Sequence, residues 1–377
     1  MENIKMIAPC LFGVGSIAAD EFRRMGFESV MVENGRVMLE GDSNMLARAN
    51  INSRFAERIL INMGQFHATT FTELFEGVKS LPWERFIGRD DAFPVSAGSS
   101  INSVLFSIPD CQSIIKKAIV DRLSSKYGIK WFAETGAEFK VRFTIIKDNA
   151  TVTIDTSGEG LHKRGYRRNS NDAPLKETLG AAMCDLARIF PDTHIYDPFC
   201  GSGTLLIESA LMATKTAPGL RRFFAAERFG SIPKTAWQQE RMRAQDLIIK
   251  NVDFKAQGYD IDPASVELTL ANAKKAGVEK YVKAAVGDIC NFKTPDERCL
   301  IITNPPYGER LLDVREAEKL YKIMGERFDR TQGKKYFVIS PHDEFEKHFG
   351  ADADKRRKLY NGMIKCQLFM YFKNKGI

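Results

Sequence analysis

The chain carries the tetrapeptide Asn304-Pro305-Pro306-Tyr307 directly after an apolar, strand-like run at 299–302. Both prolines have a fixed φ and no N–H, and each restrains the residue before it to extended geometry. The side-chain oxygen of Asn304 and the carbonyl of Pro305 can therefore act as two fixed acceptors beside the flat face of Tyr307. Such a set suits a planar base with an exocyclic amine, whereas the simpler alternative is a proline turn that caps a strand.

A glycine-rich turn precedes this motif in the chain. Residues 197–204 read DPFCGSGT and lie between a strand-like run at 194–196 and a helix-like run at 205–212. A strand, a glycine-rich turn and a helix form the first unit of a nucleotide-binding α/β sheet, and glycines let the backbone approach a ligand closely. Leu206 stands where a dinucleotide fingerprint has its third glycine, which disfavours NAD. The candidate cofactor-binding residues in the turn are Asp197, Phe199, Cys200, Gly201, Ser202, Gly203 and Thr204.

Two acidic residues follow later strand-like runs. Asp260, with Ile261 beside it, ends the run at 255–260, and Asp288 follows the run at 281–286. An acid at the end of the second strand usually binds the ribose hydroxyls about 20 residues after the glycine turn. Asp260 lies much farther along, and we attribute the extra length to a basic insertion at 213–245. Asp288 is placed to hold an adenine amino group.

Together these motifs resemble a known family. The series that is similar to class I S-adenosylmethionine-dependent amino-methyltransferases comprises DPFCGSGT (197–204), GYDID (258–262), GD (287–288) and NPPY (304–307). The stretches that resemble THUMP-containing RNA methyltransferases are LHKRGYR (161–167), APLKET (173–178) and APGLRR (217–222). The most similar branch is the guanine-N2 one, which includes the methyltransferase half of the bacterial large-subunit rRNA enzyme (RlmL-type) and its YpsC-like relatives.

The resemblance implies an α/β protein with a C-terminal Rossmann-like class I methyltransferase domain, built on a mostly parallel seven-stranded sheet. N-terminal α+β ferredoxin-like and THUMP domains would precede it. The expected parts are a ferredoxin-like domain at 1–55, a THUMP domain at 56–155, a linker at 156–172 and the methyltransferase domain at 173–377. Strands of the catalytic sheet are expected at 194–197, 255–260, 281–287, 299–304, 335–340 and near 364–373.

The function implied is methylation of the exocyclic N2 of a guanine in RNA, with 23S ribosomal RNA as the favoured substrate. S-adenosyl-L-methionine would be held by the glycine turn, Asp260, Ile261, Asp288 and Asn304. The target nucleotide would be flipped out of its helix or loop and stacked on Tyr307. Asn304 and the Pro305 carbonyl would accept hydrogen bonds from its amine, and the proton would leave to Asn304 or to water.

Parts of the same sequence pattern also occur in other function classes. A tRNA guanine-N2 methyltransferase and a non-catalytic RNA-binding protein of ribosome assembly both remain alternatives. An NAD-dependent oxidoreductase would share the sheet, but Leu206 and the NPPY tetrapeptide argue against it. A DNA adenine methyltransferase would share the motifs from 197 to 307 and would leave the LHKRGYR linker unexplained.

The positive charge is concentrated in the C-terminal part of the chain. The net charge is +7, whereas residues 1–155 alone hold 18 basic and 19 acidic residues. Basic clusters with aromatic neighbours suit a phosphate backbone and unpaired bases. A further basic cluster is the run at 355–358. The candidate RNA-binding residues are Lys163, Arg164, Tyr166, Arg167, Arg168, Arg221 and Arg222.

Composition limits the compartment and the partners. The chain is 44% hydrophobic and 27% charged, as in ordinary globular proteins, and no apolar run approaches the roughly 18 residues that span a bilayer. Seven scattered cysteines without a CxxC pair suit reduced thiols in the cytoplasm. Five histidines without ligand-like spacing predict no metal site. The oligomeric state is not predicted.

Overall fold

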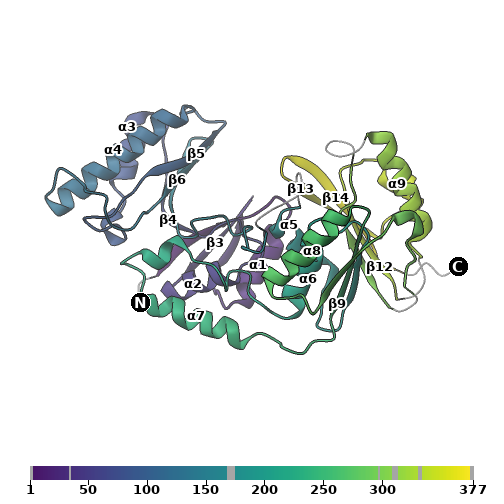
Figure 1. The fold of residues 1–377 in the computed structure, drawn as a ribbon. Coiled ribbons are helices and arrows are strands. Elements are labelled where there is room, and N and C mark those ends of the chain that lie inside the picture. The colour runs from purple at the N-terminus through teal and green to yellow at the C-terminus, as the bar shows by residue number, and fades with distance from the viewer. Residues whose placement is uncertain are drawn as a thin grey trace. The chain divides into compact units, whose positions relative to one another are not determined.

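The computed structural model describes residues 3–33, 35–167, 175–295, 298–307, 313–329 and 333–373. The chain forms two compact units (Figure 1). The N-terminal unit combines residues 1–10, 19–161 and 222–243, and the C-terminal unit combines residues 11–18, 162–221 and 244–377. The segment 222–243, which the sequence assigned to the methyltransferase part, therefore groups with the N-terminal unit. The domain boundaries expected near 55, 155 and 172 remain predictions.

The first 155 residues supply one seven-stranded sheet in the order β2-β3-β1-β4-β7-β6-β5. All its pairs are antiparallel except β5 with β6. The elements are β1 (Ile4–Pro9), α1 (Gly15–Arg24), β2 (Val30–Glu33), β3 (Arg36–Gly41), α2 (Ser43–Asn52), β4 (Leu60–His67), α3 (Phe71–Lys79), η1 (Trp83–Arg85), β5 (Val95–Ile101), α4 (Ile108–Tyr127), β6 (Val141–Ile146) and β7 (Asn149–Asp155).

Local chemistry explains several of these boundaries. The hydroxyl of Thr70 accepts from the Glu73 amide at 3.1 Å while the Glu73 carboxylate accepts from the Thr70 amide, a capping box that starts α3. Gly128, at φ +66°, ends α4. β5 begins at Val95, directly after Pro94, which has no N–H to donate to a ladder.

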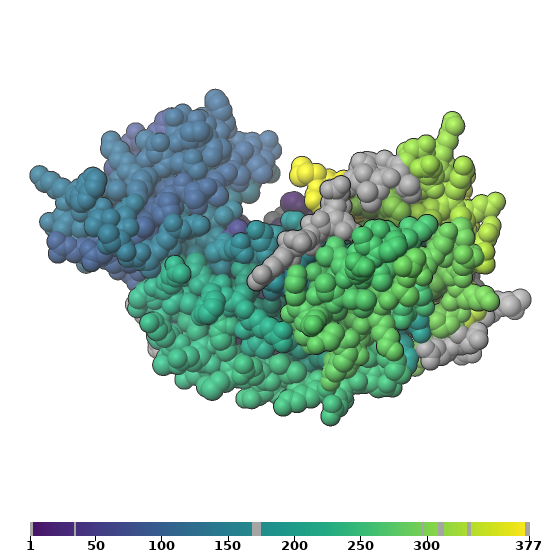
Figure 2. Space-filling view, in the orientation of Figure 1, coloured from purple at the N-terminus to yellow at the C-terminus, as the bar shows by residue number. Residues whose placement is uncertain are grey.

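Aromatic stacking joins the segment 222–243 to the rest of the N-terminal unit. The Phe229 ring stacks on Phe139 at a centroid distance of 3.8 Å. The Arg48 guanidinium donates two hydrogen bonds of 2.8 Å to the Glu240 carboxylate, a bidentate pair. This segment holds η2 (Ala225–Arg228) and most of α7 (Lys234–Asp246). Its atoms are drawn in teal-green in Figure 2.

The C-terminal unit is built on a second seven-stranded sheet, in the order β10-β9-β8-β11-β12-β14-β13. The first five strands are parallel, and β14 is antiparallel to both of its neighbours. The elements are α5 (Glu177–Ala187), β8 (His194–Asp197), α6 (Thr204–Ala213), β9 (Lys255–Asp260), α8 (Pro263–Ala276), β10 (Val282–Val286), η3 (Ile289–Asn291), β11 (Leu300–Thr303), α9 (Val314–Arg327), β12 (Lys335–Ser340), α10 (Phe345–Phe349), β13 (Lys355–Asn361) and β14 (Ile364–Tyr371).

This topology confirms the expected fold class and places the candidate motifs together. The helices α5, α6 and α8 lie as one group, and α9 stands apart from them (Figure 1). The chain runs outward from β8 through β9 to β10, and then returns to β11 on the other side of β8. Ligands of such sheets bind at the carboxyl ends of the strands beside this switch point. No helix in the described part of the chain combines the length and apolar character needed to cross a bilayer.

Candidate active site

The glycine turn after β8 is fastened to helix α8. Thr269 donates its hydroxyl to the Gly201 carbonyl at 2.8 Å, and Asn272 donates its amide to the Ser202 carbonyl at 3.0 Å. Gly203, at φ +81°, packs so closely that a Cβ there would lie 2.9 Å from Thr269. Gly201 is also left-handed, at φ +52°, but a Cβ on it would meet no atom within 4 Å. The backbone is therefore held on the α8 side and open at Gly201.

Sequence reasoning missed Thr269 and Asn272. Both side chains are fully buried, although they are polar. They lie three residues apart and therefore share one face of α8. Polar residues on the buried face of a helix were the available signal, because such groups need hydrogen-bond partners within the protein.

Asp260, at the end of β9, holds the same turn from the other side. Its Oδ2 accepts the Gly201 amide at 2.9 Å and its Oδ1 accepts the Asp262 amide at 3.0 Å. The carboxylate is therefore oriented by two backbone donors, and each oxygen can accept a further bond. Ile261 beside it is 70% exposed, an apolar side chain at the same edge of the sheet.

Asp197 joins the carboxyl ends of β8 and β11. Its Oδ1 accepts the Thr303 hydroxyl at 2.7 Å and the Phe199 amide at 3.1 Å, and the residue is buried. Burial raises the pKa of this carboxyl to about 7, although the two hydrogen bonds oppose the shift. Asp197 thus connects the ends of β8 and β11 through a hydrogen bond. Cys200 is also buried, and burial raises the pKa of its thiol.

Asn304 follows β11 at this edge. Its Oδ1 is buried and has no hydrogen-bond partner among the described residues. A buried acceptor left unpaired is uncommon and indicates a group that a ligand completes. Asp288 lies across the sheet after β10, partly buried, and its Oδ1 accepts the Cys290 amide at 2.8 Å. Pro305 is buried and Pro306 is partly buried.

Tyr307 differs from its expected role. The residue is 6% exposed, and its hydroxyl accepts a 2.7 Å hydrogen bond from the Asn361 amide in a buried environment. A ring that stacks on a flipped base must offer an open face, which Tyr307 does not do in this conformation. Asn361, the last residue of β13, is a second residue that sequence reasoning missed.

The linker arginines are also placed differently from the expectation. Arg164, Tyr166 and Arg167 were expected on an RNA-binding surface, but they point into the C-terminal unit. The Tyr166 hydroxyl donates to Glu208 Oε1 at 3.0 Å, and Arg164 Nε lies 3.5 Å from the same oxygen. Arg167 Nη1 lies 3.7 Å from the Glu177 carboxylate. Buried charge requires such partners, so these residues are structural.

The remaining candidate RNA-binding residues are divided. Lys163 and Arg221 are exposed, and Arg221 donates to the Lys275 carbonyl at 3.3 Å. Arg222 is half-buried and donates to the Glu159 and Gly160 carbonyls within the N-terminal unit. Arg168 lies outside the described residues.

Comparison with known proteins identifies the chain. It matches in succession an RlmL ferredoxin-like domain over residues 5–60, a THUMP domain over 68–155 and an RMKL-like methyltransferase domain over 164–369. It is 40% identical to YpsC of Bacillus subtilis (strain 168) over 374 residues, which covers 99% of this chain and 97% of that protein.

Two further relatives extend the comparison. The ribosomal RNA large subunit methyltransferase K/L of Cellvibrio japonicus (strain Ueda107) is 31% identical, and the match covers 98% of this chain but 51% of that protein. The chain therefore spans about half the length of this relative. The crystal structure of SMU.472 complexed with SAH has a TM-score of 0.94 at 37% identity, with 100% of both chains covered. The chain belongs to the family of RMKL-like methyltransferases.

Proposed function

We propose that the chain transfers a methyl group from S-adenosyl-L-methionine to the exocyclic N2 of a guanine in 23S ribosomal RNA. The observation that carries the proposal is the buried Oδ1 of Asn304, just after β11, which has no hydrogen-bond partner among the residues that the structure describes. Membership of the methyltransferase family and the THUMP match supply the reaction class and the RNA. The name of the K/L relative and the NPPY motif favour a ribosomal RNA amine.

The donor set at the sheet edge fits this methyl donor. The open side of Gly201, the oriented Asp260 carboxylate, exposed Ile261 and Asp288 would hold the nucleoside part. An acid in the Asp260 position suits ribose hydroxyls, and exposed Ile261 suits an apolar base face. When bound, the cofactor supplies a methyl group already activated as a sulfonium, so a strong base is not required.

Asn304 and Pro305 would orient the accepting amine. The Asn304 Oδ1 and the Pro305 carbonyl accept its two N–H groups, which aims the nitrogen lone pair. Positioning of this kind can contribute about 7–11 kcal/mol to a reaction. The same two acceptors stabilise positive charge as it develops on the nitrogen, which is electrostatic preorganisation. After transfer, the nitrogen releases its proton to Asn304 or to water.

We assign the RNA contacts in the C-terminal unit to the outer edge of its sheet, since Arg164 is buried and the Arg167 side chain is only 9% exposed. Lys355 and Lys358 are exposed on β13, the edge strand. Lys358 Nζ lies 5.4 Å from the Tyr360 ring centroid, and Phe12, 61% exposed, packs edge-on against Tyr360 at 5.9 Å. Lysines interleaved with aromatic rings suit a single-stranded backbone and its bases. β13 also carries Asn361, which connects this surface to Tyr307.

The test is nucleoside mass spectrometry of separated ribosomal RNA and tRNA from a strain that lacks the gene. Loss of N2-methylguanosine from 23S rRNA, restored by the wild-type gene and not by an Asn304→Ala gene, is the expected result. Loss of N2-methylguanosine from tRNA would mean that tRNA, and not ribosomal RNA, is the substrate. Loss of N6-methyladenosine would mean that adenine, and not guanine, is the methylated base. Unchanged nucleosides in both RNAs would favour the non-catalytic RNA-binding alternative.

A further inference from the structure

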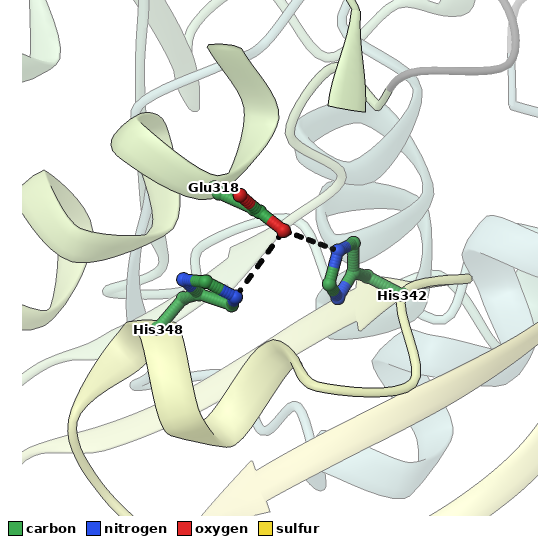
Figure 3. A group of neighbouring side chains, drawn as sticks. All are labelled: Glu318, His342 and His348. Atoms are coloured by element: carbon green, nitrogen blue, oxygen red, sulfur yellow. Dashed lines mark ion pairs between the residues drawn. The ribbon is translucent and has the colours of Figure 1, made fainter. Parts of the chain in front are cut away.

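Three side chains of metal-ligand type converge in the C-terminal unit, away from the glycine turn. Glu318 comes from α9, His342 follows β12 and His348 comes from α10. Figure 3 shows the Glu318 carboxylate directed at both imidazoles. Glu318 Oε1 lies 3.4 Å from the Nε2 of each histidine, and the three ligand atoms lie within 4.8 Å of one another.

The 3.4 Å separations have a specific meaning. Hydrogen bonds between nitrogen and oxygen are usually about 2.9 Å long, and they are weak when the two atoms are more than about 3.2 Å apart. Two ligands bound tetrahedrally to Zn²⁺ at about 2.0–2.2 Å stand roughly 3.3–3.6 Å apart. The two separations between Glu318 and the histidines are therefore those of ligands around an ion rather than those of tight hydrogen bonds.

His348 adds an independent observation. Its Nε2 is buried and makes no hydrogen bond within the described part of the chain. Buried nitrogen atoms are normally satisfied by a partner, and a coordinated ion would supply one. The same atom is the one directed at Glu318 (Figure 3).

The supporting elements are firmly packed. Phe345 and Phe349 of α10 and Tyr321 of α9 belong to one buried core cluster. The Tyr321 ring meets the His342 ring edge-on at 5.8 Å, and the two histidine rings are 5.4 Å apart and nearly perpendicular. Ligands held by packed elements keep their geometry, which is what a metal site requires.

We propose that Glu318, His342 and His348 form a three-ligand site for a zinc-like divalent ion, with the fourth position open to water. Two imidazoles and one carboxylate are typical of such ions, whereas Mg²⁺ and Ca²⁺ take oxygen ligands. The ion would join α9 and α10 to the end of β12. The sequence did not predict the site because the three residues come from separate elements without a ligand motif.

Two neighbouring groups shape the binding. The Glu344 amide donates to His342 Nδ1 at 3.1 Å, so neutral His342 carries its proton on Nε2. Coordination through Nε2 requires this proton to move to Nδ1, so binding must break the exposed hydrogen bond from the Glu344 amide. Lys319, Lys322 and Lys347 line the adjoining hollow with Glu318 and His348, so their charge weakens the site relative to a neutral one.

The test is a Zn²⁺ titration of the metal-free full-length protein against a chromophoric chelator. The titration uses a Cys290→Ser background, because Cys290 is an exposed thiol and cysteine thiolates are zinc ligands. We expect one equivalent of Zn²⁺ to bind, a higher melting temperature in the presence of Zn²⁺, and no effect of Mg²⁺ on either measurement.

Variants locate the ion. Glu318→Gln and His348→Gln should each weaken Zn²⁺ binding by more than about 100-fold. Mutation of a residue that only hydrogen-bonds to a metal ligand already lowers metal affinity by about 10–100-fold. His194→Gln, in the same unit but outside the cluster, is the matched control and should bind as the parent does. Melting curves without metal verify that each variant folds. Absence of stoichiometric Zn²⁺ binding, or binding equal in all variants, would overturn the proposal and leave the cluster as ion pairs.

Discussion

Asn361 at the end of β13 donates its side-chain amide to the Tyr307 hydroxyl at 2.7 Å, in a buried environment. The bond connects the basic edge hairpin to the NPPY motif, which follows the central strand β11. Tyr307 is therefore a positioning residue in this conformation: its ring and hydroxyl fix the loop that carries Asn304 and Pro305.

Tyr307→Phe should accordingly be more harmful than the removal of one exposed hydroxyl. It would leave the Asn361 amide buried without a partner, which costs about 1–3 kcal/mol of unfolding free energy. Asn361→Ala should cost a similar amount, and the double variant should cost clearly less than the sum. Chemical unfolding of the four proteins measures this cycle. Additive losses would mean that the bond does not couple the hairpin to the loop.

Arg167 should contribute to stability and not to RNA binding. Arg167→Met removes one partner of a buried ion pair with Glu177, and such losses cost roughly 3–5 kcal/mol. Arg221 is exposed, so Arg221→Met should change the free energy of unfolding by no more than about 0.5 kcal/mol. Urea unfolding compares the two variants. Equal stability of both would return Arg167 to the candidate RNA surface.

The β13 lysines should carry part of the RNA affinity. Lys355→Ala with Lys358→Ala should reduce the slope of log affinity against log salt by about 0.7 for each lost contact on single-stranded RNA. Lys283→Ala is the control, since Lys283 is exposed on β10, the opposite edge strand of the same sheet. Filter binding at several salt concentrations gives the slopes. The assignment fails if the double variant keeps the wild-type slope.

Asp197 should make stability depend on pH. Its pKa rises from 3.8 to about 7 on folding, so between these values the unfolded chain loses a proton that the folded chain keeps. Stability from this group is therefore full below about pH 4 and falls as the pH rises through 7, by at most about 4 kcal/mol. Asp197→Asn should remove this dependence of stability on pH. Towards pH 8 the variant should therefore lose less free energy of unfolding than the wild type does. Parallel pH profiles of both proteins would contradict the assignment.

The sequence predicted local structure and the strand-end motifs well. The strands β8 to β12 lie within one residue of the expected ranges. The glycine and acidic residues that follow these apolar runs mark where the strands end. The family and fold class are confirmed. The sequence could not show that Arg164 and Arg167 are buried, because their partners Glu208 and Glu177 lie on helices α6 and α5.

Long-range pairing explains the other differences as well. Asn361 reaches Tyr307 across 54 positions, and Arg48 reaches Glu240 across 192. No local sequence pattern predicts either of these two contacts. The same reasoning applies to segment 222–243, where Phe224 stacks on Trp237 and Phe229 stacks on Phe139, whereas Phe223 remains 86% exposed.

Asp260→Ala should weaken S-adenosyl-L-methionine binding by roughly 1.5–3 kcal/mol, through the loss of a charge-assisted contact and of the Gly201 tether. Asp262→Ala is a suitable control, because Asp262 caps α8 through the Ala264 and Ser265 amides and should affect stability rather than affinity. Calorimetry with the cofactor measures both variants. Unchanged affinity in Asp260→Ala would remove this residue from the site.

The most direct measurement is single-turnover methylation of the target RNA by wild type and Asn304→Ala, with nucleoside analysis of the product. Asn304 acts on the amine as charge develops, so its loss should abolish methyl transfer while cofactor and RNA affinities stay near the wild-type values. The product of the wild-type protein should be N2-methylguanosine. Wild-type turnover by Asn304→Ala would contradict the central claim, and N6-methyladenosine as product would overturn the choice of guanine.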